Sequence, residues 1–390
     1  MHIELLSKLV SGLSVLGMLL SANLGIQPRN QLAQVPSVVR GEVLGASIPE
    51  LPRAYVDTTL PSTSGTCTVN IASGGDLQAA IDSAKLGDTI CVQAGATFVG
   101  PFILPKKTNG SGWVTIRTST PDASFVSPGT RVSPSDASKM AKLVSPGFNE
   151  AVIQTKTAAN NYRLIGLEIT KKTPDIHVTE LIVLGDWRES RVNAWGVDTN
   201  PEDQPYNIVL DRMYIHGDMI SETKRGVRMH CNNCAVIDSH ISQIQSSWQD
   251  TQAILGWNSQ GPFKIVNNYL EATGENVMFG GGDPSIHHEP TLMPGQTKSS
   301  ATLSSVDGLS VGQGIMFTVG GKTGESSWTT VRSINGNSIT FDPIASVPDA
   351  GSKAYFGVIP SDFEIRKNYF VKPRYWNPKD PSFAGKNYAI

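Results

Sequence analysis

The chain of 390 residues carries little charge, and its positive and negative charges nearly cancel. Charged residues make up 17% of the sequence, and the formal net charge is -2. Proteins that hold nucleic acid through their overall charge are strongly basic, so we expect no nucleic-acid partner. Cysteine is also scarce, with four residues, which excludes a fold held together mainly by disulfides. Glycine and proline are frequent instead, and they are typical of a chain with many turns.

Long hydrophobic runs are missing except at the N-terminus, where Leu9–Ile26 is largely apolar. Its length suits a signal peptide or a membrane anchor. Ala22 could end a cleavage signal, but Leu20 is too large for the usual small-x-small pattern, so both alternatives for residues 1–26 stay open. We expect an extracellular or cell-surface protein that meets a membrane only through this segment, if it is not removed. Residues 27–66 contain five prolines and are predicted to be a linker.

The chain changes character after the linker, where one short helix precedes many short strands. Asp76 is placed to cap this helix, and the next residues give it a single apolar face. Four residues form that face: Leu77, Ala80, Ile81 and Ala84. A short amphipathic helix followed almost only by strands predicts a cap over a β structure.

One phrase then recurs, consisting of a short strand, a polar or glycine corner and a second short strand. It occurs as YRLIGLEI (162–169), IVLDRMYI (208–215), AVIDSHI (235–241), FKIVNNYL (263–270) and FEIRKNYF (363–370). Apolar anchors in these copies, Leu164, Val209, Val236, Ile265 and Ile365, are 45, 27, 29 and 100 residues apart. Two of these gaps are close to one turn of a β-solenoid.

The largest gap contains a separate pattern of strands over residues 289–358, including the hairpin signal Asn335-Gly336. Without this insertion the gap shrinks to about the length of one coil. A second series of strands, at 181–186, 226–230, 252–256 and 276–280, lies between the copies of the phrase. The sequence therefore predicts an all-β, single-stranded right-handed parallel β-helix with three sheets. It would span 67–288 and 359–390, interrupted by a small antiparallel module and truncated at its last coil.

The capping phrase LQAAIDSAKLGDTICVQAGATFVGPFIL and the phrase FKIVNNYL resemble the pectate-lyase-like right-handed parallel β-helix proteins of the pectin lyase fold superfamily. Phrases such as QAILGWN and GENVMFGG are most similar to bacterial β-helix repeat proteins without an established activity. The resemblance covers Cys67 to the end of the chain, apart from the insertion. It implies that a substrate cleft runs along the sheet formed by the second series of strands.

Charged residues open three successive strands of that sheet. Lys224 and Arg225 open one strand, Asp250 the next and Glu275 the one after, 25 residues later. Because adjacent coils are about 4.8 Å apart, these side chains should form a column. Such a column suits cleavage of a uronate-containing polysaccharide by β-elimination, with a basic side chain taking the α-proton and with Ca²⁺ held by Asp250 and Glu275. Further candidates for substrate binding are Arg228, Trp257, Asn258 and Asn276.

Other interpretations stay open. Charges on the rim of a solenoid also serve solubility, so the chain could be a non-catalytic carbohydrate-binding or surface structural protein. The phrase QDT (249–251) followed by ENVMFGG is similar to pectin methylesterases, which makes a carbohydrate esterase a further alternative. In that comparison Glu275 replaces the second aspartate, and the arginine of the phrase LGRPW is missing.

The cysteines fall into two pairs. Cys67 and Cys91 flank the helix candidate, and we expect them to form a disulfide in an exported chain. Cys231 and Cys234 form the motif CNNC, which no second motif completes as a metal site. They are expected to be a disulfide that tightens a turn, or two free thiols.

Overall fold

The computed structural model describes residues 51–60, 66–185, 198–247, 249–320, 326–372 and 379. The predicted signal peptide or anchor and most of the predicted linker lie outside these ranges. Within them, no helix is both long and apolar enough to cross a membrane.

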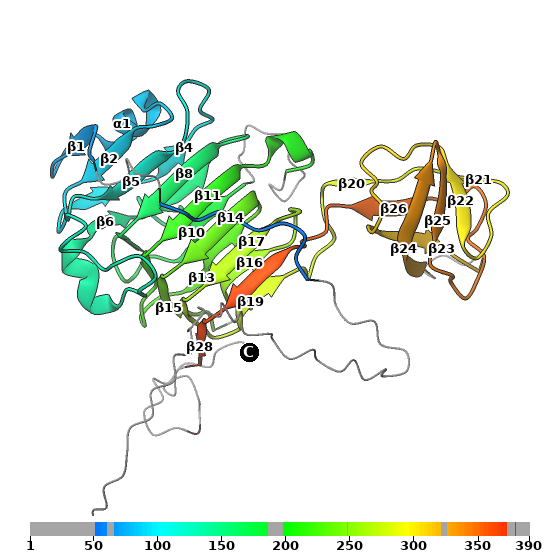
Figure 1. Ribbon diagram of the computed structural model, residues 1–390. Helices are drawn as coiled ribbons and strands as arrows, with labels where there is room; N and C mark the ends of the chain where they lie inside the picture. The colour runs from blue at the N-terminus through cyan, green and yellow to red at the C-terminus, as the bar shows by residue number, and fades with distance from the viewer. Residues whose placement is uncertain are drawn as a thin grey trace, which may run out of the picture. The chain divides into compact units, whose positions relative to one another are not determined.

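The chain folds as a parallel β-helix in which strands of successive coils pair in parallel to form three sheets (Figure 1). This confirms the predicted fold class, including the capping helix and the inserted antiparallel module. The eight-stranded sheet contains β1 (Val69–Ile71), β2 (Thr89–Val92), β5 (Val114–Thr118), β8 (Asn160–Ile165), β11 (Tyr206–Asp211), β14 (Asn232–Ile237), β17 (Phe263–Val266) and β27 (Phe363–Arg366).

The other two parallel sheets complete the coils. The six-stranded sheet contains β4 (Phe102–Leu104), β7 (Ile153–Thr155), β10 (Val178–Leu184), β13 (Thr223–Met229), β16 (Gln252–Gly256) and β19 (Glu275–Phe279). The seven-stranded parallel sheet contains β3 (Thr97–Val99), β6 (Ala141–Val144), β9 (Leu167–Thr170), β12 (Tyr214–His216), β15 (His240–Ile244), β18 (Tyr269–Ala272) and β28 (Tyr369–Val371).

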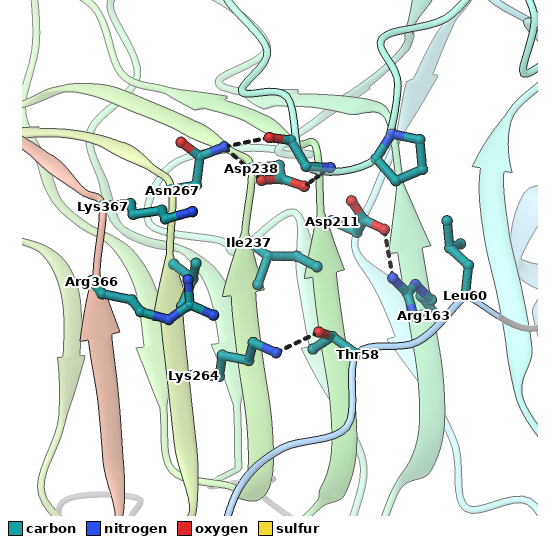
Figure 2. Close-up of a pocket in the computed structure, with 13 residues that line it drawn as sticks. Thr58, Leu60, Arg163, Asp211, Ile237, Asp238, Lys264, Asn267, Arg366 and Lys367 are labelled. Carbon is teal, nitrogen blue, oxygen red and sulfur yellow. Dashed lines mark hydrogen bonds and ion pairs between the residues drawn. The ribbon is translucent and has the colours of Figure 1, made fainter. Parts of the chain in front are cut away.

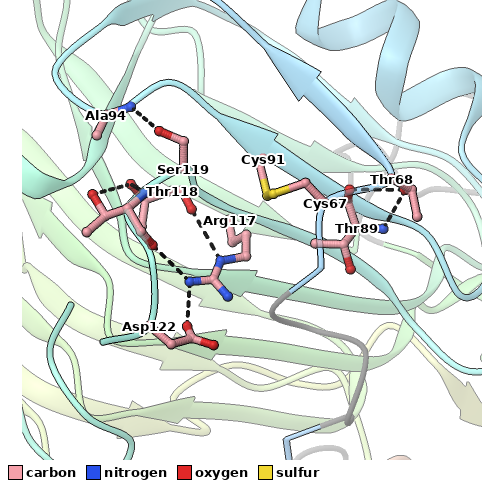
Figure 3. The surroundings of a disulfide bond; sticks show 10 residues. Cys67, Thr68, Thr89, Cys91, Ala94, Arg117, Thr118, Ser119 and Asp122 are labelled. Carbon is pink, nitrogen blue, oxygen red and sulfur yellow. Dashed lines mark hydrogen bonds and ion pairs between the residues drawn. A yellow bond between two sulfur atoms is a disulfide. The ribbon is translucent and has the colours of Figure 1, made fainter. Parts of the chain in front are cut away.

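The first coil is closed by α1 (Leu77–Ser83), whose N-terminus is capped by the Asp76 carboxylate accepting a hydrogen bond from the Ala79 amide at 2.9 Å. The apolar face predicted for this helix is buried against the first strands. A disulfide joins Cys67 to Cys91 on β2, as predicted, next to the hydrogen bonds between Thr68 and Thr89 (Figure 3). Among the described residues, the other helices are the short 3-10 turns η1 (Pro134–Lys139) and η2 (Pro201–Asp203).

The insertion forms its own antiparallel sheet around a separate apolar core. Its predicted hairpin at Asn335-Gly336 joins β24 (Ser326–Asn335) to β25 (Ser338–Phe341). The module consists of β20 (His287–His288), β21 (Leu292–Met293), β22 (Ser300–Leu303), β23 (Gly314–Thr318), β24 (Ser326–Asn335), β25 (Ser338–Phe341) and β26 (Ala354–Gly357).

Five tight corners between the eight-stranded and seven-stranded sheets each use one residue in the left-handed conformation. These residues are Gly166, Arg212, Asp238, Asn267 and Lys367, with φ between 51° and 64°. The structure corrects the alignment of one repeat, because Leu164 pairs with Leu210 and not with Val209. Val209 points to the outer face but is buried there, so the alternation of apolar and polar residues that would have indicated its direction is absent.

The segment that buries Val209 comes from the predicted linker. Residues 51–60 lie across the outer face of the eight-stranded sheet, where Val56 packs with Val209, Ala235 and Val266. The carbonyl of Thr59 accepts a hydrogen bond from Arg163 on β8 at 3.0 Å. The predicted linker 27–66 is therefore wrong over 51–60, because these residues bury apolar surface as part of the β-helix.

We expect Val56→Ala to lower the free energy of unfolding by about 2 kcal/mol, since two buried methyl groups are lost and a gap is left. Val99→Ala is the matched control, because Val99 is half exposed on β3, and it should change the stability by less than about 0.5 kcal/mol. Urea unfolding measures both variants. Equal stability of Val56→Ala and Val99→Ala would show that the segment adds no stability by docking.

Candidate functional site

The charged side chains predicted to form a column do lie together, on the six-stranded sheet. Strand pairing sets Glu180, Arg225, Gln252 and Glu275 beside one another on four successive strands. A parallel ladder repeats the same position once per coil, so these side chains form one row across the sheet. We call this row, with Lys224, Arg228 and Asp250, the charged row.

The part of the row on β10 and β13 is a buried ion-pair cluster around Glu180. Arg225 Nη1 lies 2.6 Å from Glu180 Oε1, and Arg228 Nη2 lies 3.2 Å from Glu180 Oε2. Glu180 is only 9% exposed, so its charge is stabilised by these two guanidinium groups rather than by water. One carboxylate thus holds two arginines in place.

Gln252 connects the two halves of the row. Its side-chain oxygen accepts a hydrogen bond from Arg225 Nε at 3.2 Å. Its side-chain nitrogen donates to Asp250 Oδ2 at 2.9 Å and to Glu275 Oε2 at 2.8 Å. The amide can lie only this way round, because a flipped amide would place its oxygen between two carboxylates. Asp250 and Glu275 are therefore joined through Gln252, and the direct stacking of the two acids that their spacing suggested is wrong.

Lys224 completes the row at its exposed side. Its Nζ lies 3.4 Å from Asp250 Oδ1, and the Asp250 side chain is 61% exposed. The hydrogen bond from Gln252 and the charges of Lys224 and Arg225 hold the pKa of Asp250 below its usual value. Asp250 is thus an anion at neutral pH, and its contact with Lys224 is open to exchange with solvent or a ligand.

The residues do not fit the predicted Ca²⁺ site. A bridging cation would need oxygen ligands between Asp250 and Glu275, but the Gln252 amide donates hydrogen bonds into that position. In the part of the chain that the structure describes, no group of three His, Cys, Asp or Glu side chains is arranged to hold a metal ion. The Ca²⁺ prediction therefore gains no support from the geometry.

Two asparagines predicted to contact substrate have structural roles instead. Asn258 is fully buried, and its amide bonds the backbone of Asp198, Ser285 and Ile286 at 2.8–3.1 Å. Asn276 donates to the backbone carbonyls of Leu270 and Val371. Buried backbone groups of the loops need hydrogen-bond partners inside the coil. The side-chain amides of Asn258, just after β16, and Asn276, near the start of β19, supply them.

Trp257 is half-buried at the end of β16, where its ring meets the buried His230 edge-on with centroids 4.1 Å apart. This position lies at the opposite end of β16 from the charged row. The disulfide joins Cys231, which follows His230 in the connection after β13, to Cys234 on β14. Of the two readings of CNNC, the structure shows the disulfide.

Sequence reasoning missed Glu180 and Gln252, the two residues that organise the row. Neither residue was a candidate, because Glu180 precedes the apolar run 181–186 that predicts the strand and Gln252 carries no charge. The signal that could have identified them is the pairing register between strands of successive coils. Glu180 is 45 residues before Arg225, close to the 46 residues that separate Leu164 from its partner Leu210 in the next coil.

Comparisons with known proteins assign no family to the chain. No family model matches the chain, and a search of curated proteins finds no match. Among solved structures, an alginate lyase from Paenibacillus sp. str. FPU-7 is similar at 14% identity and a TM-score of 0.28, over 54% of this chain and 84% of that chain. A structure of Escherichia coli YbhC is similar at 16% identity and a TM-score of 0.28, over 62% of this chain and 72% of that one.

We expect Gln252→Leu to raise the pKa of Asp250 toward the ordinary value of 3.8, because the Gln252 hydrogen bond is the largest cause of its depression. Carboxyl carbon NMR across an acid titration measures this pKa. Gln260→Leu replaces an exposed glutamine and should leave it unchanged. An Asp250 pKa that is the same in the wild type and in Gln252→Leu would contradict the connected row.

Proposed function

We propose that the protein is an exported polysaccharide-active enzyme whose charged row cleaves a uronate-containing polysaccharide by β-elimination. The observation that carries this proposal is the pair of arginines held by one buried carboxylate, next to a lysine whose own partner is exposed. Arginine pairs well with a sugar carboxylate, and an amine next to it can move a proton. Export and an extracellular or cell-surface location belong to the same proposal and rest on the N-terminal sequence.

The roles follow from the contacts. Glu180 positions Arg225 and Arg228, and the guanidinium of Arg225 keeps Nη2 without a hydrogen bond to any residue that the structure describes. In this proposal Arg225 binds the uronate carboxylate through that nitrogen. The positive charge stabilises the negative charge that spreads onto the carboxylate when the neighbouring carbon loses its proton.

Lys224 is proposed as the proton carrier. In its neutral form Nζ takes the proton from the carbon next to the carboxylate, and the electron pair forms a carbon–carbon double bond as the glycosidic C–O bond breaks. The leaving oxygen then takes a proton from the Lys224 ammonium, so no other reactant is consumed. The ion pair between Lys224 and Asp250 is long, and Asp250 is exposed, so in this proposal the pair separates when Lys224 contacts the sugar. No step requires the predicted Ca²⁺.

A non-catalytic carbohydrate-binding protein is the second candidate. The observation that favours it is charge balance, because the three cations of the row face three carboxylates, Glu180, Asp250 and Glu275. A row that is neutral overall can stabilise the sheet through its ion pairs. It can then bind a sugar chain on its surface without catalysing a reaction. An esterase that uses Asp250 and Glu275 is a further alternative, and it would act on methyl-esterified polymer.

A panel of uronate polysaccharides tests the proposal through the ultraviolet absorbance of the unsaturated product. We expect product from at least one polymer, and Lys224→Ala should lower its rate about 100-fold or more, the usual contribution of a proton-transfer group. Arg332→Ala is the control, since it removes a cation from an exposed ion pair of the inserted module. Methanol release without unsaturated product would indicate the esterase, and binding without either product would indicate the carbohydrate-binding protein.

A further inference from the structure

A polar cavity lies away from the charged row, on the outer face of the eight-stranded sheet. Its volume is about 370 Å³, near the lower end of the range of about 300–1,000 Å³ for small-molecule sites. The floor is apolar, formed by Ile237 and Val266, and charged side chains surround it (Figure 2). The cavity is lined by four cations, Arg163, Lys264, Arg366 and Lys367, and by two acids, Asp211 and Asp238.

Its walls are held in place by specific hydrogen bonds. On one side is the docked segment 51–60, from which Thr58 accepts a hydrogen bond from Lys264 at 2.8 Å. On the other is the loop containing Gly129, whose amide donates to Asp238 at 2.7 Å. Arg131 ties this loop to the backbone of Asn267 and Lys367 at 3.0 and 2.9 Å. The cavity is thus a built feature of the fold.

The acids of the cavity are already satisfied by protein donors. Asp211 accepts hydrogen bonds from Arg163 at 2.7 Å and from Arg212 at 2.8 Å. Asp238 accepts from Gly129 and from Asn267, each at 2.7 Å. Asp211 is thus neutralised by two guanidinium groups, and the four lining cations outnumber the two lining acids, so the cavity favours an anion.

The cations, in contrast, have unused donors. Arg163 is 1% exposed, and its buried Nε has no hydrogen-bond partner in the described structure. Lys264 has three donors, of which one binds Thr58, while its ion pair with Glu364 is long at 3.8 Å. Lys367 has neither an ion pair nor a side-chain hydrogen bond with any described residue, and Figure 2 shows its amine turned toward Asn267 and the cavity.

We propose that this cavity is an anchoring subsite that binds one hexuronate unit of an acidic polysaccharide. A pyranose ring offers an apolar face for Ile237 and Val266, while its carboxylate meets Lys264 and Lys367. The inference rests on the proposed polysaccharide substrate, but it assigns a separate face of the β-helix. A long polymer held at both sites would bind more tightly than a short one, because the second contact is intramolecular.

NMR with a saturated hexuronate trimer tests this assignment in the full chain. The amides of Gly129 and Asn267 report on the cavity, and we expect them to shift saturably with the trimer. A neutral hexose trimer and inorganic sulfate should shift them at least tenfold more weakly. Sulfate as effective as the trimer would overturn the saccharide assignment in favour of a general anion site, and no shift with the trimer would overturn the site altogether.

Variants separate this site from the charged row. Lys264→Met with Lys367→Met keeps the aliphatic stems and should weaken binding at Gly129 and Asn267 at least tenfold. Lys298→Met removes one exposed charge of the inserted module and should have no effect. Unweakened binding in the double variant would contradict the inference.

The two proposals fail separately. Lys224→Ala with Arg225→Ala should leave the shifts of Gly129 and Asn267 intact, since Lys224 and Arg225 lie on the six-stranded sheet and the cavity lies on the eight-stranded sheet. Trimer binding at the cavity in a protein that cleaves no polymer would support the subsite and refute the lyase. Cleavage of polymer without any shift at the cavity would refute the subsite alone.

Discussion

The hydrogen-bonded pairing of parallel strands from coil to coil governs the β-helix and the charged row on it. Because each strand pairs in register with the next, a side chain at one position is repeated about 4.8 Å away in the neighbouring coil. Apolar positions become a continuous core, and polar positions become rows. The charged row is one such row, in which Glu180, Arg225, Gln252 and Glu275 occupy the same place on successive strands.

The same constraint explains how charges are tolerated on a sheet that is otherwise apolar. A lone buried acid such as Glu180 would be costly, but the ladder supplies arginines from the next coil. On the outer face of the eight-stranded sheet, Val209, Ala235 and Val266 form an apolar patch, and residues 51–60 cover part of it. The cavity lies beside Thr58 and Leu60 of this segment, with cations from the flanking strands around its floor.

Much of the architecture was predictable from the sequence, because coils leave a period. The capping helix, the repeated phrase, the insertion and the Cys67–Cys91 disulfide all carry local signals. The docking of residues 51–60 carried none, since a proline-rich segment with one buried valine is not distinguishable from a linker. The slip at Val209 has the same cause, because a strand buried on both faces does not alternate.

The site was predictable only in part. Spacing placed Lys224, Arg225, Asp250 and Glu275 on one sheet, but charge alone could not show that Gln252 lies between the acids. The asparagines 258 and 276 look like ligand-binding groups in a sequence, whereas the structure uses them to satisfy backbone inside the coil. Finding the residues that organise a row requires the pairing register of neighbouring strands. That register can be assigned only when the first and last residue of each strand are known.

The most direct test of the charged row is a crystal structure of the Lys224→Ala variant soaked with a hexuronate tetramer. We predict a sugar carboxylate bound to Arg225 Nη2, with Glu180 still bridging the two arginines. A tetramer found elsewhere, with the hydrogen bonds of Arg225, Gln252 and Glu275 undisturbed and no sugar beside them, would contradict the account.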